Sequence, residues 1–374
     1  MNVIFTCGGT GGHIFPAIAV AKLLRERRPD CNILFMGAED GMETTLVPRE
    51  GFELETVRIS NFQRGLSKDA LEHNVEMFRN MKDAMKKAKQ VIRSFKPDVI
   101  VGTGGYASFP ALAEGAKLGV KTVVHESNAV PGLTTRMVER TADVIMVGFE
   151  ESRQYYHHPE RVRVTGMPVR DEFIYADRQK AREKMGLDER PLVVSYWGSL
   201  GAREMNKIIA CFMKLECDDG EPFSHIHATG SFGWKWMPEF VKEQGVDLSQ
   251  HPSVDMRVFI YDMPDVMAAA DLVICRAGAA TISEICASAT PCIMVPSPNV
   301  TDNHQEKNAR VMERGGAAVV LREAECSGEV LYQTAKELLC DKERLSAMRK
   351  AAAAMAPVDA AERIYETVLE MAKA

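Results

Sequence analysis

The chain has 374 residues, a length that suggests two domains. Of these residues 46% are hydrophobic and 26% are charged, which is typical of a globular protein. Its 46 basic and 52 acidic residues leave a net charge of −6, which argues against nucleic acid as a partner. Nine cysteines form no CxxC pair, the chain starts without a signal-peptide pattern, and no run of roughly 18 apolar residues occurs. We therefore expect a cytoplasmic protein with reduced thiols and no membrane-spanning helix.

Short apolar runs alternate with helical periodicity through the first half of the chain. The predicted strands, which have the composition of strands buried on both faces, are 3–5, 33–36, 99–101, 122–124 and 144–147. Helical stretches lie at 17–27, 71–93 and 109–117. This alternation predicts a parallel, doubly wound sheet.

The same pattern restarts after Gly166-Met167-Pro168-Val169. A helix is predicted at 204–214, and the predicted strands are 192–195, 226–229, 257–260, 272–274, 292–295 and 318–321. We predict an α/β protein with two Rossmann-like domains, residues 1–165 and residues 166–356. A last helix, within 357–374, is expected to pack back on the first domain.

Glycine-rich turns follow three of the predicted strands, at 8–13, 102–106 and 197–202. Glycine lets the backbone approach a ligand closely, and the free N–H groups of a helix start favour an anion. The dinucleotide fingerprint fails, because Ile14 stands at the third glycine position and no acidic residue ends the second strand at Met36-Gly37. Tight turns alone are the alternative, but three such turns in two domains favour an anionic ligand in an interdomain cleft.

Three further polar segments follow strands and admit two interpretations each. His125-Glu126-Ser127-Asn128 either faces the cleft or forms a solvated loop. Glu284, in the segment 276–284, either accepts the hydroxyls of a ribose or forms a capping box with Thr281. The segment 302–305 offers the same ambiguity between a ligand contact and a cap, since Asp302 and Gln305 also have capping-box spacing.

No two aspartates in the chain are separated by exactly one residue. The Asp-x-Asp element that holds a divalent metal on the diphosphate of many sugar nucleotides is therefore missing. We expect helix N-termini, hydroxyl groups and a cation such as Arg170 to meet the charge of a diphosphate instead.

These motifs together resemble the MurG family, the bacterial N-acetylglucosaminyltransferases of peptidoglycan synthesis. The resemblance runs from residue 8 to residue 363. It rests on Gly8-Gly9-Thr10-Gly11-Gly12-His13 with Phe15-Pro16, Gly104-Gly105-Tyr106, His125-Glu126-x-Asn128, Gly166-x-Pro168-Val169-Arg170, Gly198-Ser199-x-Gly201-Ala202, Arg276-x-Gly278-Ala279-x-Thr281-x-x-Glu284 and Asp359-Ala360-Ala361-x-Arg363.

The resemblance implies the two-domain GT-B fold, with an N-terminal acceptor domain and a C-terminal domain that binds the UDP-sugar. It implies an inverting transfer of N-acetylglucosamine from UDP-N-acetylglucosamine to the 4-hydroxyl of the muramoyl sugar of undecaprenyl-linked lipid I. The products would be lipid II and UDP, and neither a metal nor a cofactor would be needed.

The resemblance also implies roles for individual residues. His13 would be the catalytic base or would orient its loop, and Ile260 would read uracil through its backbone. Glu284 would bind the ribose. The other implied substrate contacts are Thr10, Gly11, Gly12, Glu126, Asn128, Arg170, Ser199, Ala279, Ala280, Thr281 and Gln305.

Three positions depart from the family pattern. Trp197 and Leu200 replace a glycine and a glutamine of the family's Gly-Gly-Ser-Gln-Gly-Ala, and Ser127 replaces a glutamine. Two other functions share parts of this pattern: a UDP-N-acetylglucosamine 2-epimerase, which would need several acid/base carboxylates around the sugar, and a non-catalytic module that binds a nucleotide sugar.

The helix predicted over 71–93 carries an unusual charge. Between Arg58 and Lys96, ten basic and four acidic residues leave +6, so the rest of the chain carries −12. One apolar and one basic stripe recur at helical spacing: Leu71, Val75, Phe78, Met81, Met85, Ala88 and Ile92, and Arg79, Lys82, Lys86, Lys89 and Arg93. We expect the apolar stripe to be buried in the domain core. We predict that the basic stripe binds the anionic inner face of the cell membrane, with Phe62 or Leu66 inserting shallowly. The alternative is that the basic stripe is merely solvated.

Overall fold

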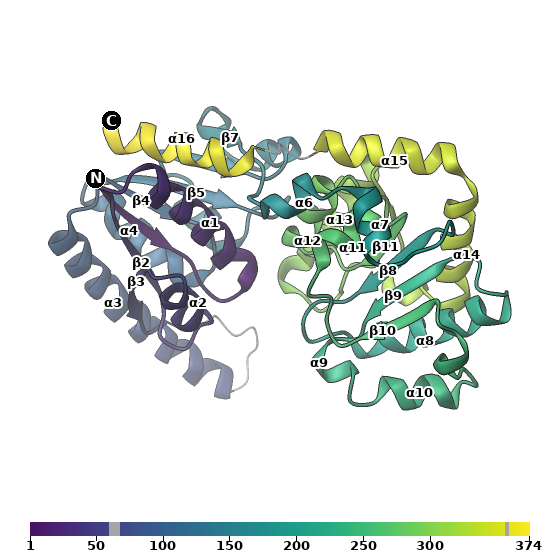
Figure 1. Ribbon diagram of the computed structural model, residues 1–374. Helices are drawn as coiled ribbons and strands as arrows, with labels where there is room; N and C mark the ends of the chain where they lie inside the picture. Colours follow the sequence, from purple (N-terminus) through teal and green to yellow (C-terminus); the bar gives the residue numbers. More distant parts are fainter. Residues whose placement is uncertain (60–67, 356–358) are drawn as a thin grey trace. The chain divides into compact units, whose positions relative to one another are not determined.

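A computed structural model describes residues 1–59, 68–355 and 359–374 (Figure 1). The chain divides into two units. Unit 1 comprises Met1–Val169 and Pro357–Ala374, and unit 2 comprises Arg170–Ala356. Each unit holds one parallel sheet with helices on both faces, which confirms the predicted fold class.

Unit 1 has a seven-stranded sheet in the order β3-β2-β1-β4-β5-β6-β7. Its strands are β1 (Asn2–Thr6), β2 (Asn32–Ala38), β3 (Glu53–Val57), β4 (Val99–Gly102), β5 (Lys121–Glu126), β6 (Val144–Val147) and β7 (Val162–Val164). Its helices are α1 (Gly11–Arg27), α2 (Glu43–Arg49), α3 (Lys68–Phe95), α4 (Phe109–Lys117), α5 (Leu133–Val138) and α16 (Ala360–Lys373), with a 3-10 turn η1 (Tyr106–Ser108).

Strand β1, an inner strand of the unit 1 sheet, is buried on both faces, as its apolar run predicts. Val3 and Phe5 pack with α1 and with Ile364 of α16, whereas Ile4 packs with Ala88 of α3 and with α4. Because successive side chains of a strand point to opposite faces, one apolar run supplies both cores.

Unit 2 repeats this topology in a six-stranded sheet, in the order β10-β9-β8-β11-β12-β13. Its strands are β8 (Leu192–Tyr196), β9 (Ser224–Ala228), β10 (Val254–Arg257), β11 (Leu272–Cys275), β12 (Cys292–Met294) and β13 (Ala318–Val320). Its helices are α6 (Asp171–Tyr175), α7 (Arg178–Lys184), α8 (Arg203–Asp218), α9 (Gly230–Gly233), α10 (Met237–Glu243), α11 (Met263–Ala269), α12 (Ala279–Ala287), α13 (His304–Arg314), α14 (Gly328–Cys340) and α15 (Lys342–Met355).

The strands of the structure differ from the predicted strands in two respects. Strands β3 and β7 were not predicted, because both lie at sheet edges and carry polar residues that hide the apolar pattern. The strand predicted at 257–260 is wrong, since β10 ends at Arg257. Three apolar residues in a row, Val258 to Ile260, suggested a strand where the chain already turns toward α11.

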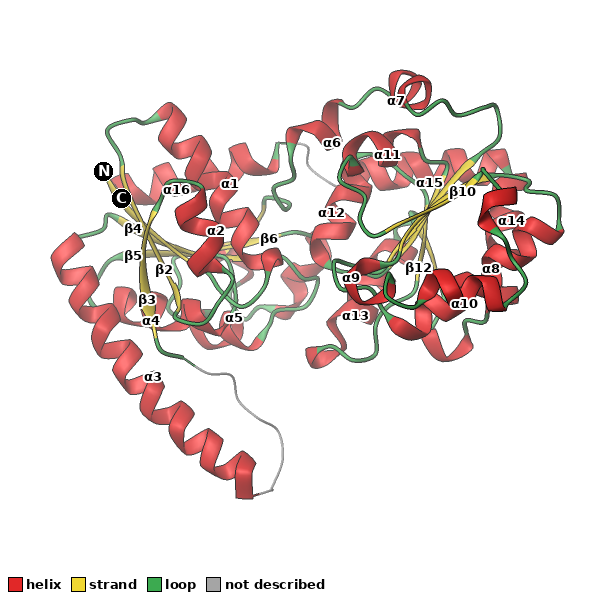
Figure 2. Cartoon of the chain, turned by 60° about the horizontal axis from the view of Figure 1, so that its bottom comes forward, coloured by secondary structure: helices red, strands yellow, loops and turns green. Residues whose placement is uncertain are grey.

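Helix α3 is the longest helix of unit 1, and its N-terminal half runs out beyond the sheet (Figure 2). Ala84, Ala88 and Ile92 are buried against the sheet, whereas Met81 and Met85 of the predicted apolar stripe are only half-buried. Of the basic stripe, Lys89 is half-buried, and the exposed members are Arg79, Lys82, Lys86 and Arg93.

Part of the membrane prediction falls outside the described residues. Phe62 and Leu66 lie there, as do the side chains of Leu71, Val75 and Phe78. Within the described ranges, every helix is too short or too polar to cross a membrane.

Candidate active site

In both units the predicted site residues lie at the carboxyl ends of the parallel strands or in the loops and helices that follow those ends. Ligands of doubly wound sheets bind at this edge, next to the point where the strand order reverses. In unit 1 that point lies between β1 and β4, and in unit 2 it lies between β8 and β11.

The turn after β1 holds His13 in a defined orientation. Its imidazole Nδ1 lies 3.0 Å from the carbonyl oxygen of Gly8 and 3.5 Å from the hydroxyl of Thr10. A carbonyl oxygen only accepts hydrogen bonds, so we assign the imidazole hydrogen to Nδ1. In the neutral ring Nε2 is then unprotonated and can accept a proton.

Two glycines of the turn after β4 pack against His13 and the turn that holds it. A Cβ added to Gly104, whose φ is +108°, would lie 2.7 Å from Cδ2 of His13. A Cβ added to Gly105 would lie 2.1 Å from the carbonyl oxygen of Gly8. The glycines at 104 and 105 are thus required by the packing of two loops, in addition to any close approach to a ligand.

Helix α1 begins inside the glycine turn, earlier than the predicted start at 17. Gly11 is its first residue, and Thr10, the N-cap residue, makes no side-chain cap. Helix starts carry partial positive charge on N–H groups without helical partners. The first turn of α1, with Gly11 and Gly12, can therefore bind an anion.

Glu126 has a role that the sequence did not reveal. It is buried, and its Oε1 accepts the backbone N–H of Asn128 at 3.0 Å and its side-chain amide at 3.1 Å. Its Oε2 accepts from Gly132 N–H at 2.9 Å and from the Thr135 hydroxyl at 2.7 Å. Glu126 thus holds the loop that carries Asn128, while a direct contact of either residue with a substrate stays a prediction.

His125 supports the neighbouring chain segment. It is fully buried, and its Nε2 lies 2.8 Å from the carbonyl oxygen of Gly166. Burial lowers the pKa of His125 below its ordinary value, so the ring is neutral and donates to this carbonyl.

In unit 2, Ser199 lies in the turn after β8. Helix α8 begins four residues later, at Arg203, so Ser199 precedes the helix and is not part of its first turn. Ser199 is exposed, and its carbonyl oxygen accepts the N–H of Ser231 at 3.1 Å. A Cβ added to Gly201 would lie 2.1 Å from the carbonyl oxygen of Thr229, so this glycine lets the turns after β8 and β9 pack together.

The helix that carries Glu284 does not begin with a capping box. Gly278 is the N-cap residue of α12, and no side-chain cap is present. Thr281 is the third helical residue, so it cannot form the predicted capping box with Glu284. Burial raises the pKa of Glu284 to about 7, and the charge of Arg170 opposes this shift. Ala279, Ala280 and Thr281 form the first turn, and all three are half-buried.

Gln305 and Ile260 complete the predicted contacts of unit 2. The capping box at 302–305 does not form either, because Asn303 in the left-handed region is the N-cap of α13. Gln305 Oε1 accepts the N–H of Ser297 at 2.9 Å. Ile260 is buried beyond the end of β10, next to Tyr261, whose side chain is exposed.

Trp197 and Arg276 form a contact that no sequence signal announced. Arg276 donates to the carbonyl oxygen of Val295 at 2.9 Å and pairs with Glu323 at 2.6 Å, and its guanidinium lies 5.9 Å from the buried Trp197 ring centre. One arginine thus connects the ends of the adjacent strands β8, β11, β12 and β13. These partners are up to 126 positions apart in sequence, so local patterns could not reveal them.

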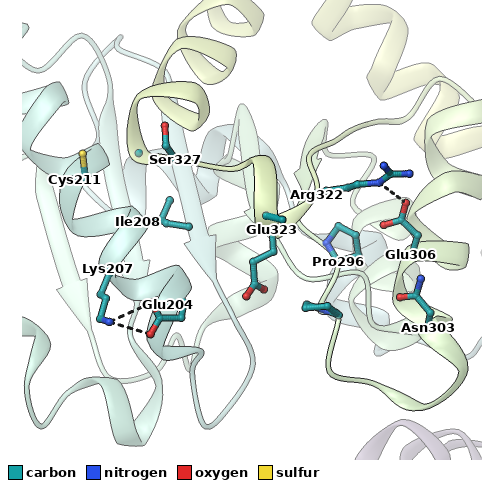
Figure 3. A pocket seen from close by; sticks show the side chains of 13 residues that line it. Glu204, Lys207, Ile208, Cys211, Pro296, Asn303, Glu306, Arg322, Glu323 and Ser327 are labelled. Atoms are coloured by element: carbon teal, nitrogen blue, oxygen red, sulfur yellow. Dashed lines mark hydrogen bonds and ion pairs between the residues drawn. The ribbon is translucent and has the colours of Figure 1, made fainter.

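A pocket of about 820 Å³ lies in unit 2 between α8, α13 and the start of α14 (Figure 3). None of the predicted site residues lines it. Glu204 pairs with Lys207 on one wall, and Glu306 faces Arg322 on another. Within the described ranges, no three His, Cys, Asp or Glu side chains gather closely enough to hold a metal ion.

Two family models match the chain and together span most of it. The glycosyltransferase family 28 N-terminal domain matches residues 3–147, and the family 28 C-terminal domain matches residues 193–364. Among solved structures, the crystal structure of MurG from Acinetobacter baumannii is similar over 99% of both chains, with a TM-score of 0.78 and 26% identity. A UDP-GlcNAc 2-epimerase from Neisseria meningitidis shares only the fold, with 13% identity and a TM-score of 0.65.

Curated relatives carry one common name, UDP-N-acetylglucosamine–N-acetylmuramyl-(pentapeptide) pyrophosphoryl-undecaprenol N-acetylglucosamine transferase. The relative from Acetivibrio thermocellus is 40% identical over 100% of this chain and 99% of its own length. The relative from Halalkalibacterium halodurans is 37% identical over the full length of both chains. The chain therefore belongs to the MurG family within glycosyltransferase family 28, and it is a glycosyltransferase.

Proposed function

We propose that this enzyme transfers N-acetylglucosamine from UDP-N-acetylglucosamine to the 4-hydroxyl of the muramoyl sugar of undecaprenyl-linked lipid I, which yields lipid II and UDP. The observation that carries the proposal is full-length similarity, at 37–40% identity, to relatives named for this transfer. The oriented imidazole of His13 supports it, because the reaction needs a base at neutral pH.

The chemistry proceeds in one displacement. Nε2 of His13 accepts the proton of the acceptor hydroxyl while its oxygen forms a bond to the anomeric carbon. The bond from that carbon to the diphosphate breaks, and UDP leaves with the electron pair. Attack opposite the leaving group inverts the configuration, and no metal takes part in the proposed reaction.

Unit 2 binds the donor in this proposal. Uracil contacts the backbone of Ile260, and the ribose hydroxyls donate to Glu284. Ser199, Arg170 and the N–H groups at the start of α8 stabilise the negative diphosphate. Gln305 and the first turn of α12, residues 279–281, contact the sugar.

Unit 1 binds the acceptor. The N–H groups of Gly11 and Gly12 and the hydroxyl of Thr10 meet its phosphates, and Asn128, held by Glu126, contacts sugar hydroxyls. The lipid part of this acceptor remains in the bilayer. The enzyme is therefore expected to be a cytoplasmic protein bound peripherally to the inner face of the cell membrane.

Purified protein, UDP-N-acetylglucosamine and a lipid I analogue test this function. Release of UDP only when the acceptor is present, unaffected by a chelator, is the expected result. NMR of the product should show inversion at the anomeric carbon. Formation of N-acetylmannosamine would instead indicate an epimerase, and donor binding without turnover would indicate a non-catalytic module. Strict dependence on magnesium would contradict the metal-free reaction.

Replacing Ser199 with alanine should slow transfer. Loss of one hydrogen bond to the charged leaving group costs about 1.5–3 kcal/mol, or roughly 10- to 150-fold in kcat. Ser346→Ala, at an exposed position of α15, is the matched control and should keep the wild-type rate. Equal rates for the two variants would remove Ser199 from the proposed site.

Charge reversal on α3 should abolish binding to anionic membranes. Each basic side chain near an anionic leaflet contributes about 1 kcal/mol, so replacing Lys82, Lys86 and Arg93 with glutamate removes the attraction and adds repulsion. Co-sedimentation with anionic and neutral vesicles, at low and high salt, measures the effect.

The matched control reverses the same number of exposed charges on α15 of unit 2, at Lys342, Arg344 and Lys350. This control should still bind anionic vesicles, and both triple variants should bind UDP normally. Equal loss of binding in the two variants would show that total charge, and not α3, determines attachment.

A further inference from the structure

A buried carboxylate lies behind the glycine turn of unit 1. Glu43, the first residue of α2, is fully buried. Its Oε1 accepts the backbone N–H of Ala38 at 2.7 Å, and its Oε2 has no hydrogen-bond partner among the described residues. Burying a carboxylate with a single hydrogen bond lowers the stability of the fold, so Glu43 is expected to have a role other than packing.

Three glycines from three segments enclose the Glu43 side chain. A Cβ added to Gly8 would lie 2.6 Å from its Oε1, one added to Gly37 would lie 2.5 Å from its Cγ, and one added to Gly41 would clash with its carboxylate. The backbone at the ends of β1 and β2 therefore closes directly on this one side chain.

The peptide of Gly8 is held from two sides. The Glu43 carboxylate and the methyl group of Ala107 fill the space where a side chain of residue 8 would lie. Gly105 approaches the Gly8 carbonyl oxygen so closely that it admits no Cβ. That same oxygen accepts the hydrogen bond from Nδ1 of His13. Glu43 and His13 thus contact the same residue: the Glu43 carboxylate packs against Gly8, and the His13 imidazole is hydrogen-bonded to the Gly8 carbonyl oxygen.

Two groups compete for Nδ1 of His13. The Gly8 carbonyl can only accept, which requires the Nδ1–H tautomer. The Thr10 hydroxyl, 3.5 Å from the same nitrogen, can donate, which would require the Nε2–H tautomer and leave no base on Nε2. The tautomer of a neutral histidine follows the hydrogen bond that its other nitrogen makes. The position of the Gly8 carbonyl therefore decides which nitrogen is basic.

We propose that Glu43 is a positioning residue for His13, which fixes the Gly8 carbonyl and so keeps Nε2 unprotonated. This inference rests on the proposed function, in which Nε2 is the base. Glu43 touches no substrate, and its effect passes entirely through Gly8.

Nitrogen-15 NMR of the histidine-labelled full chain tests the tautomer without any substrate, with His13→Asn to assign the signal. Near pH 8 the wild-type protein should show the Nδ1–H form. Glu43→Ala and Glu43→Asp both withdraw the carboxylate from Gly8, so they should shift His13 toward the Nε2–H form and lower kcat at least about tenfold. Their UDP affinity should not change.

Glu43→Gln keeps the shape of the side chain, so it should restore the wild-type tautomer and a kcat within about threefold of wild type. Glu39→Ala is the matched control, because Glu39 is an exposed carboxylate in the same connection. It should behave like wild type.

Wild-type tautomer in a folded Glu43→Asp or Glu43→Ala variant would overturn the proposal, and so would failure of Glu43→Gln to restore it. Thermal melts identify any variant that does not fold, and the aspartate variant then decides. If the wild-type protein transfers no sugar, the proposed function fails, but the tautomer shift still reports separately on Glu43.

Discussion

Replacing His13 should lower kcat by about 10²–10⁴-fold, the usual contribution of a general base. The choice of substitution separates the two roles that the sequence left equal. In His13→Asn the amide nitrogen can occupy the position of Nδ1 and still donate to the Gly8 carbonyl, but nothing replaces Nε2. His13→Ala loses both groups.

If Nε2 is the base, the asparagine and alanine variants should be equally slow. If His13 only orients its loop, the asparagine variant should keep most of the activity. UDP affinity, measured by calorimetry, should be unchanged in both variants because the proposed UDP contacts all lie in unit 2. Full activity of His13→Ala would exclude both roles.

UDP affinity should fall as the pH drops below about 7. The half-buried carboxyl of Glu284 has a pKa that desolvation raises to about 7, and only its ionised form accepts hydrogen bonds from both ribose hydroxyls. Below this pKa the group must lose a proton on binding, so the dissociation constant should rise by up to about tenfold per pH unit. Above it, affinity should level off.

Glu284→Gln should flatten this pH profile and weaken UDP binding by about 10- to 100-fold at pH 8, because a charge-assisted hydrogen bond is lost. Folding should not be weakened. The folded-state pKa is raised, so the carboxylate's contribution to stability is lost as pH rises from the unfolded value toward 7, and the neutral amide avoids this loss. Glu313→Gln, at the end of α13 and remote in sequence, is the control. A pH-dependent affinity that persists in Glu284→Gln would assign the titration to another group.

Local sequence patterns predicted some elements of the fold and missed others. Strand β1 was predicted because a short apolar run buried on both faces is a local pattern. Helix α3 was predicted from its amphipathic spacing, but its described buried side chains are Met77, Ala84, Ala88 and Ile92, whereas Met81 and Met85 are only half-buried. Edge strands β3 and β7 carry no such pattern and were missed.

In the candidate site, too, local patterns were informative for some features and not for others. Because the glycine-rich segments directly follow strands, the sequence alone indicated where an anion could approach the backbone. The two capping boxes, by contrast, did not form, because a helix start depends on where the chain leaves the preceding strand as well as on the residues at capping positions. Thr281 and Glu284 have the spacing of a capping box, but Thr281 lies inside α12 and is not its N-cap residue.

The sequence by itself determined the fold class, the order of the turns and the family, since apolar periodicity and contiguous motifs are written in neighbouring residues. Only the tertiary structure decided what each polar group does. His125 proved to contact the carbonyl oxygen of Gly166, and Arg276 proved to contact Val295 and Glu323. Gly105 closes on Gly8 from nearly a hundred residues away. Hydrogen-bond partners and burial depend on which distant segments the sheet brings together, and no local pattern contains that information.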